Sequence, residues 1–214
     1  MVALGLSSET VTASVPGRRT GVTNLSTAAV YLMDNGDDAE LASRCLRGDQ
    51  QAFEPLVTRY EKVLFNVALR MVGNHEDARD IAQTTFAKAY EKLDTYDSRY
   101  RFFSWIYRIM MNEALNLIGR RRSHQPLDPR LVSPDDPHES AEARELSERI
   151  QGALLELPPD YREVLILRHF AELSYGEMSA LLAVPEKTVK SRLYTARQRL
   201  GEALEVLLER GGSR

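Results

Sequence analysis

Two stretches of this sequence carry side chains that could bind nucleic acid. In the first, residues 96–108, aromatic side chains alternate with cations. The members are Tyr96, Tyr100, Phe102, Phe103, Trp105 and Tyr107, interleaved with Arg99, Arg101 and Arg108. Rings stack on unpaired bases at about 1–3 kcal/mol each while cations follow the backbone, so the pattern predicts contact with single-stranded DNA. For any one ring, above all Phe103 and Trp105, packing in the core is an equally good interpretation.

The second stretch, residues 174–200, has the signals of a helix-turn-helix. Ser174 and Glu177 predict a capping box that opens one helix. Val184 with Pro185 predicts a tight turn, after which a basic helix begins near residue 186. Its outward-facing residues are Lys187, Thr188, Lys190, Ser191, Arg192, Thr195 and Arg199. The second helix of this motif lies in the major groove, so we expect Lys190 and Arg192 to extend into solvent; the alternative is an ordinary solvated helix face.

The distribution of charge along the chain supports a nucleic-acid partner, whereas the net charge does not. The formal net charge is -3, which by itself argues against DNA binding. The carboxylates, however, gather in residues 34–40, 135–148 and 202–209, whereas residues 120–122 and 187–199 are basic runs without an acid. Acidic and basic surfaces are therefore expected to be separate.

The sequence offers no pattern for catalysis, a metal or a membrane. Cys45 is the single cysteine, and the histidines are too dispersed for a zinc ligand set, so neither a disulfide, a metal nor another cofactor is expected. The histidines are His75, His124, His138 and His169. We find no spacing typical of paired catalytic carboxylates, an activated nucleophile or a phosphate-binding glycine loop, so we expect no enzyme. Without an apolar run of about 20 residues or a secretion signal, a cytoplasmic location is expected.

Helical periodicity throughout predicts an all-α protein of two small helical domains joined by a flexible linker. The first domain, residues 37–122, should contain a helix capped by Asp49 that ends at Gly73. Asn74 should cap a second helix that reaches residue 93, and a polar loop at 94–101 should precede a third helix at 103–121. Residues 1–36 are rich in small and polar residues and are expected to be disordered, and Met33 could be the true start.

The stretch SHQPLDPRLVSPDDPH predicts the linker, residues 123–141. The second domain, residues 142–210, should open with a helix that Pro158 and Pro159 stop. Asp160 with Glu163 then predicts a capping box for a short helix, ahead of the helix-turn-helix.

Four segments in this order resemble the sigma-70 family of RNA polymerase subunits, specifically its small extracytoplasmic-function (ECF) group. They are DARDIAQTTFAKAY from Asp77, FFSWIYRIMMNEALN from Phe102, LPPDYREVLILRHF from Leu157 and LSYGEMSALLAVPEKTVKSRLYTARQRL from Leu173. The resemblance covers about residues 39–208. It implies a factor that binds core polymerase and directs promoter recognition and DNA melting, with no chemistry of its own.

The resemblance also assigns roles to residues. From the residue types alone, the polar face of the segment 77–93 is an ordinary solvated helix surface. The resemblance instead implies that this face binds the coiled coil of the polymerase's largest subunit. The expected contact residues are Asp77, Asp80, Gln83, Thr84 and Phe86. The minus-ten element is expected to be recognised and melted by Arg99, Tyr100, Arg101, Phe102, Trp105, Arg108, Asn112, Asn116 and Arg120. The basic helix should read the minus-thirty-five element. The polymerase flap and an anti-sigma factor are further expected partners.

This sequence departs from the usual family pattern at two positions of the basic helix. Lys187 stands where many members have Gly, and Thr195 stands where many have Arg. These departures leave the promoter sequence unpredicted. The rival hypothesis is an autonomous regulator that binds a palindromic operator as a dimer, which a light-scattering mass would distinguish from a monomeric factor.

Overall fold

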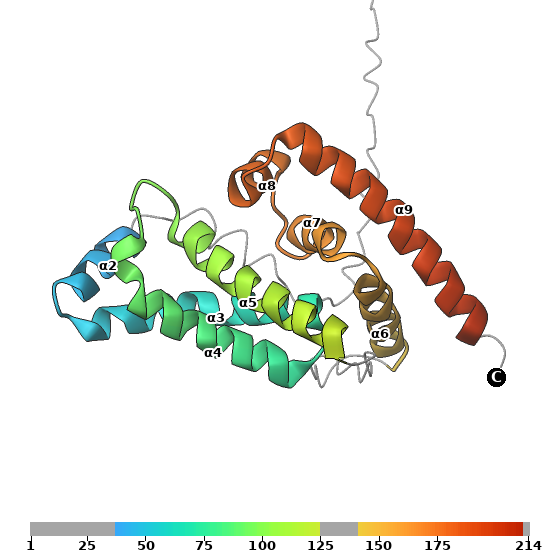
Figure 1. Cartoon of the computed structure of the whole chain (residues 1–214), viewed down its shortest axis with the longest axis horizontal. Coiled ribbons are helices and arrows are strands. Elements are labelled where there is room, and N and C mark those ends of the chain that lie inside the picture. Colours follow the sequence, from blue (N-terminus) through green and yellow to red (C-terminus); the bar gives the residue numbers. More distant parts are fainter. Residues whose placement is uncertain (1–36, 125–140, 212–214) are drawn as a thin grey trace, which may run out of the picture.

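The computed structural model describes residues 37–124 and 141–211, and every regular element in these ranges is a helix (Figure 1). The helices are α2 (Asp38–Leu46), α3 (Glu54–Val72), α4 (His75–Glu91), α5 (Phe102–His124), α6 (Ala141–Glu156), α7 (Pro159–His169), α8 (Tyr175–Leu182) and α9 (Glu186–Gly211). The predicted all-α class is confirmed. The ends of the predicted linker belong to α5 and α6, while its remainder, and residues 1–36 for which disorder was predicted, lie outside the described residues.

The first domain is built on α3, which packs against both α4 and α5. Its apolar stripe includes Leu56, Leu64 and Met71, each with no exposed surface. The helix ends as predicted at Gly73, which takes a left-handed φ of 73° and donates its amide to the Leu69 carbonyl at 2.7 Å. Asn74 then caps α4, since its side chain accepts a hydrogen bond from the Asp77 amide at 3.1 Å.

The predicted cap at Asp49 is wrong. A short 3-10 turn at Gln50–Phe53 precedes α3, which therefore begins at Glu54, and Asp49 makes no side-chain cap. Its carboxylate instead accepts from the Arg44 guanidinium at 2.6 Å, which lowers the pKa of Asp49. The ion pair gives the carboxylate a stronger donor than a backbone amide would.

Helix α2 was not predicted from the sequence, and a buried carboxylate holds it on the domain. Asp38 is completely buried and accepts hydrogen bonds from the Tyr60 hydroxyl and the Arg59 guanidinium, both on α3. Burial, followed by the hydrogen bond to Asp38, raises the pKa of Tyr60. Asp38, which in the sequence belongs to the acidic run at residues 34–40, therefore holds α2 against α3.

In the second domain the helix-turn-helix forms as predicted. The Ser174 hydroxyl accepts from the Glu177 amide at 3.2 Å, while the Glu177 carboxylate accepts from the Ser174 amide at 2.9 Å, so the capping box is complete. Ala183, with a φ of 53°, ends α8 in the left-handed conformation and makes the turn toward α9.

The predicted capping box of Asp160 and Glu163 is wrong. Pro158 is the N-cap of α7 and Pro159 its first residue, so Asp160 already lies inside the helix and caps nothing. Proline presets the backbone angle of a first helical turn and has no amide to satisfy, which moves the helix start forward. Glu163 is left available for a contact with the first domain.

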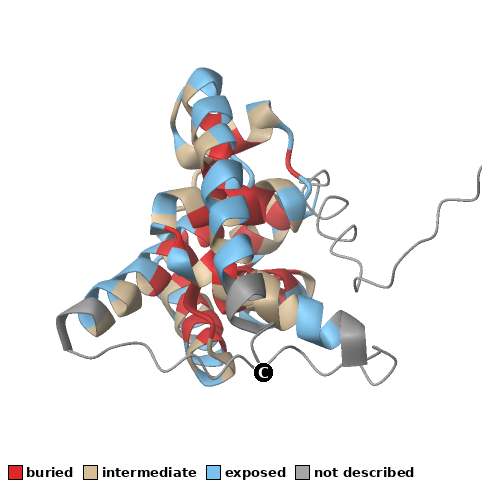
Figure 2. Cartoon of the chain, turned by 90° about the vertical axis from the view of Figure 1, so that its right-hand side faces the viewer, coloured by how far each residue is buried: buried red, intermediate tan, exposed pale blue. Residues whose placement is uncertain are grey.

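The two domains share one continuous hydrophobic core, visible as the buried interior in Figure 2. Helix α3 of the first domain packs against α6 and α7 of the second. Arg162, on α7, is only 4% exposed, and its guanidinium donates to carbonyls at the ends of both domains' helices. The acceptors are Met71 of α3 and, in and just after α6, Leu154, Leu155 and Leu157. One buried cation therefore satisfies helix ends that would otherwise be orphaned.

We expect Ser174→Ala to destabilise the chain by about 1 kcal/mol, because it removes the hydroxyl half of the capping box that opens α8. Chemical denaturation followed by circular dichroism measures the change. Ser98→Ala, in the exposed turn before α5, is the matched control and should change the free energy of unfolding by less than about 0.5 kcal/mol. Equal effects of the two substitutions would contradict the assignment.

Candidate nucleic-acid interface

The aromatic cluster before and within α5 divides into core and surface. Phe102 is fully buried, with ring-centroid distances of 5.2 Å to Tyr96 and 5.4 Å to Trp105. Phe103 and Tyr107 are also buried, whereas Tyr96 and Trp105 are half-buried and Tyr100 is 66% exposed. Of the predicted minus-ten residues, Phe102 can therefore support this surface but cannot touch DNA in this conformation.

Local hydrogen bonds hold the loop that carries Tyr100. The Tyr96 hydroxyl donates to the Tyr100 carbonyl at 2.9 Å, and burial raises the pKa of Tyr96 to about 12. Asp97 accepts from both the amide and the guanidinium of Arg99, and this pairing lowers the pKa of the Asp97 carboxyl. The Arg99 side chain remains 83% exposed. The loop thus presents a ring and a cation side by side at the surface.

Helix α5 continues this surface as a polar stripe. Arg108, Asn112, Asn116 and Arg120 are all exposed and recur at every fourth position, so they lie along one face of the helix. Amide and guanidinium groups in this alternation can donate to bases and phosphates. The structure brings these predicted residues together with the loop, and places them on a single helix.

The basic helix α9 begins with a solvated face. Lys187, Lys190 and Ser191 are exposed, and the Lys190 side chain is 56% exposed with Glu186 at 3.4 Å. The expectation for Lys190 is confirmed. Arg192 differs, because its side chain is 30% exposed and lies 3.7 Å from the Asp160 carboxylate of α7. Thr188 and Thr195 are half-buried, and Arg199 is exposed.

Sequence reasoning missed Tyr194, which is 66% exposed on α9. Its hydroxyl accepts a hydrogen bond from the Gln198 side chain at 3.0 Å. An aromatic residue on this face belongs neither to the polar and charged set expected to contact DNA nor to the apolar stripe expected to pack inward. The signal that could have found it is its spacing, four residues after Lys190 and three after Ser191.

The predicted polymerase-binding residues lie on α4 beside a surface cavity that α5 completes. Asp80 and Gln83 are exposed and Thr84 is half-buried, whereas Phe86 packs partly into the core. Asp77 forms an ion pair with Arg121 of α5. The cavity is lined by Asp77, Asp80, Ile81 and Thr84 from α4 and by Glu113, Leu117 and Arg120 from α5. Residues assigned to the polymerase and to DNA therefore border the same cavity.

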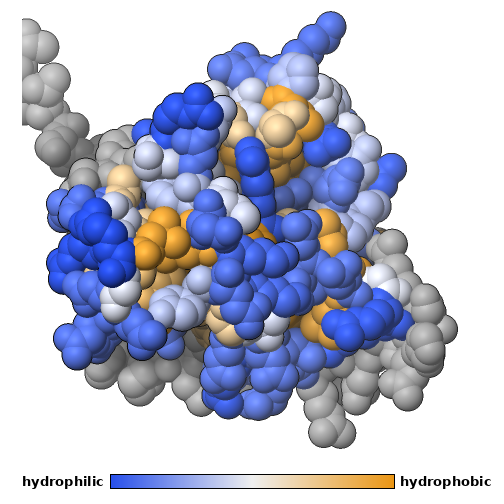
Figure 3. All heavy atoms as spheres, turned by 60° about the vertical axis from the view of Figure 1, so that its left-hand side comes forward, coloured by the Kyte–Doolittle hydropathy of each residue, from blue (hydrophilic) through white to orange (hydrophobic). Residues whose placement is uncertain are grey.

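Apolar groups reach the described surface in places, among them the lining of a cavity between α6, α7 and α9. Figure 3 shows one face, mostly hydrophilic, broken by separate hydrophobic patches. Across the part of the chain that the structure describes, no three His, Cys, Asp or Glu side chains are grouped as a metal site would need. No helix there is sufficiently long and apolar to span a bilayer.

Comparison with known proteins agrees with this geometry. Residues 56–124 match the family Sigma-70 region 2, and residues 147–200 match the family Sigma-70, region 4. The chain is 33% identical to the ECF RNA polymerase sigma factor SigW of Bacillus subtilis (strain 168) over 174 residues, 75% of this chain and 93% of that protein. It is 32% identical to the ECF RNA polymerase sigma-E factor of Escherichia coli (strain K12) over 186 residues, 81% of this chain and 97% of that one.

Two solved structures are similar to this chain over most of its length. The structure of CnrH in complex with the cytosolic domain of CnrY superposes with a TM-score of 0.60 and 28% identity, covering 78% of this chain and 96% of that one. The sigma factor RpoE in complex with the anti-sigma factor NepR from Bartonella quintana gives a TM-score of 0.60 and 26% identity, covering 72% and 97%.

We expect the hydroxyl of Tyr96 to stabilise the loop that carries Tyr100, and its ring to stabilise the packing of the aromatic cluster. Tyr96→Phe should lower the free energy of unfolding by about 0.5–1.5 kcal/mol, because the bond to the Tyr100 carbonyl is lost. It should leave the fluorescence of Trp105, the single tryptophan, unchanged. Tyr96→Ala removes the ring 5.5 Å from Trp105 and should red-shift that emission. Identical spectra for both variants would contradict the described packing.

Proposed function

Because the chain belongs to the extracytoplasmic-function group of the sigma-70 family of RNA polymerase sigma factors, we propose that three of its surfaces divide the work of transcription initiation. One binds core polymerase, one recognises and opens the minus-ten element, and one reads the minus-thirty-five element. The observation that supports this assignment is the presence, in one chain, of two separate exposed surfaces that carry cations and rings: the Tyr100 loop with the polar stripe of α5, and the basic start of α9.

The polymerase surface is the exposed face of α4 around Asp80, Gln83 and Thr84. Its ligand is the coiled coil of the polymerase's largest subunit, to which this exposed polar face offers hydrogen-bonding side chains. The Asp77–Arg121 pair fixes α5 against the start of this face. Phe86 supports it from within.

The minus-ten surface is the Tyr100 loop with the α5 stripe. Melting requires a base to leave the stack at a cost of a few kcal/mol, which ring stacking and hydrogen bonds must return. Tyr100 and Trp105 supply ring faces, while Asn112 and Asn116 supply polar groups that can read base edges. Arg99 and Arg120 would contact phosphates at either end of the stripe.

The minus-thirty-five surface is the first three turns of α9. Lys187 and Lys190 are placed for phosphates, and Ser191 for a base edge in the major groove. Tyr194 adds an apolar face of the kind that contacts a thymine methyl group. Arg199 lies further along the helix, with its guanidinium 4.8 Å from the centre of the Tyr161 ring.

Partners beyond the polymerase follow from the relatives. RpoE of Bartonella quintana is seen in complex with the anti-sigma factor NepR, and this chain resembles it over most of its length. We include an anti-sigma factor among the partners of this chain and the cytoplasm as its location. The named relatives are sigma factors rather than dimeric operator-binding regulators or enzymes, which disfavours both alternatives.

Gln83→Ala should weaken binding to core polymerase by about tenfold, because an exposed side chain in the centre of the α4 face is truncated. Fluorescence anisotropy of labelled chain titrated with core polymerase gives the affinity, and run-off transcription from promoters of the same genome gives the activity. Glu61→Ala, on an exposed part of α3, is the control and should leave both unchanged. Wild-type chain that opens no promoter with core polymerase would refute the function itself.

Two substitutions on α9 should separate phosphate contact from base reading. Lys190→Ala should weaken holoenzyme binding to all promoter sequences alike and reduce the slope of log affinity against log salt by about 1. Tyr194→Ala should leave that slope unchanged and relax sequence preference within the minus-thirty-five element. Lys62→Ala, exposed on α3, controls for loss of a positive charge. A salt slope that responds equally to Lys62→Ala would count against the phosphate contact.

A further inference from the structure

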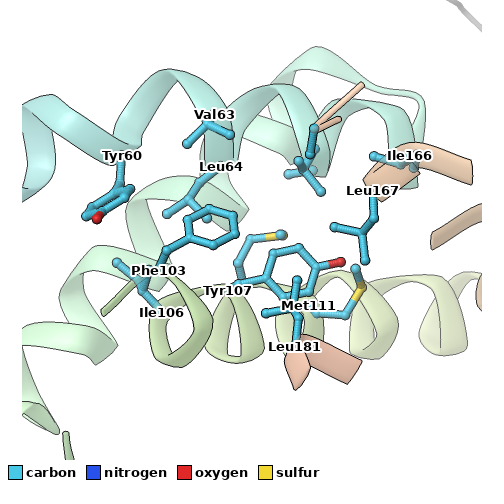
Figure 4. Packing of buried hydrophobic residues seen from close by; sticks show 14 of the residues in the cluster. Tyr60, Val63, Leu64, Phe103, Ile106, Tyr107, Met111, Ile166, Leu167 and Leu181 are labelled. Carbon is cyan, nitrogen blue, oxygen red and sulfur yellow. The ribbon is translucent and has the colours of Figure 1, made fainter. Parts of the chain in front are cut away.

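The second domain contains a cavity that none of the proposed polymerase and promoter residues lines. Helices α6 and α7 both pack against α9 (Figure 1), and the three helices together surround a cavity of about 250 Å³. Ile166 and Leu167 of α7 take no part in it, because they lie in the core that this domain shares with the first (Figure 4). The cavity is therefore separate from the surfaces assigned to transcription.

The lining of this cavity is mostly apolar. Leu154 of α6 and Leu165 of α7 are buried, while Ile150, Phe170 and Leu200 are partly buried and complete the apolar part of the lining. A hydrocarbon group placed here would remove the exposed part of this lining from water, which favours binding. The cavity is thus suited to an apolar ligand.

Two basic side chains complete the lining and are exposed to solvent. They are Arg197 of α9 and His169 of α7. The Arg197 guanidinium can only donate, and it lies 3.4 Å from Nε2 of His169, so that ring nitrogen accepts and carries no proton. Burial, followed by the charges of Arg197 and Arg168, lowers the pKa of His169. The imidazole is therefore neutral at neutral pH, and the positive charge at the cavity belongs to Arg197.

The charge of Arg197 is not neutralised by the protein. Among the described residues, no carboxylate lies within ion-pair distance of its guanidinium, whose polar contact is the neutral His169. On the neighbouring α6, by contrast, Arg149 pairs with Glu145 at 2.5 Å. A guanidinium binds a carboxylate through paired hydrogen bonds in a fixed geometry. Beside an apolar cavity, it favours a ligand with an apolar body and a carboxylate head.

We propose that this cavity binds a free medium-chain carboxylic acid, with its hydrocarbon chain among the apolar side chains and its carboxylate on Arg197. Binding of such a ligand goes beyond the function proposed above and does not rest on it. At about 250 Å³ the cavity is smaller than the roughly 300–1,000 Å³ of sites for drug-sized ligands, which favours one chain of about eight to ten carbons. An amine of the same length would instead be repelled by Arg197.

The test is isothermal titration calorimetry of the full chain with hexanoate, octanoate, decanoate and dodecanoate, each below its micelle concentration. We expect one saturable site whose affinity rises about fourfold for each added methylene up to decanoate. Dodecanoate should bind no more tightly than decanoate, because its chain is longer than the cavity. Decylamine, with the same chain as decanoate and the opposite charge, should bind at least about tenfold more weakly.

Two substitutions locate the ligand, each with a matched control. Arg197→Gln removes the charge and should weaken decanoate binding by about tenfold, whereas Arg79→Gln, exposed on α4, should leave it unchanged. Ile150→Phe fills the cavity and should abolish binding, whereas Leu146→Phe, exposed one turn earlier on α6 and outside the lining, should not. Circular dichroism checks that each variant is folded.

Three results would overturn the inference while leaving the sigma-factor function intact. The first is the absence of saturable binding by the full chain, and the second is equal affinity for decanoate and decylamine. The third is an affinity that changes with neither Arg197→Gln nor Ile150→Phe. A chain that lacks residues 1–33 is titrated in parallel. If it bound decanoate where the full chain did not, the cavity would belong to that segment of the chain, and the proposed ligand would be wrong.

Discussion

The architecture depends on a buried guanidinium at the meeting point of two helix ends. Arg162 donates to carbonyls of α3 and α6, and so it ties the first domain to the second through hydrogen bonds that water would otherwise make. Each buried carbonyl left without a donor costs about 1–3 kcal/mol. The arginine therefore fixes where α7 sits, and α7 in turn places α8 against α5.

This constraint also decides how close the two proposed DNA-binding surfaces lie to each other. The same packing that positions α9 brings α8 onto α5, the helix proposed to bind the melted strand. In this packing Arg101 and Arg108 contact α8, while the α4 face proposed to bind the polymerase stays exposed.

Local signals in the sequence were sufficient for the helices other than α2 and for several of their ends. Gly73, Asn74 and Ser174 act through neighbours three or four residues away, so their roles could be predicted. The roles of Asp38 and Glu163 could not be predicted. Their hydrogen-bond partners lie 22 and 56 residues away along the chain, and their burial is decided by tertiary packing. Periodicity likewise could not show which rings of the aromatic cluster face the core. Residue assignments to the polymerase and promoter came from family resemblance.

The most direct test of the account is site-specific cross-linking in a promoter complex. A benzophenone amino acid at Tyr100 and another at Tyr194, introduced in separate chains, report which DNA each surface touches. The account predicts cross-links from Tyr100 to the unpaired non-template strand at minus ten and from Tyr194 to duplex at minus thirty-five, both dependent on core polymerase. Cross-links from both positions to the same stretch, or equal yields without polymerase, would contradict it.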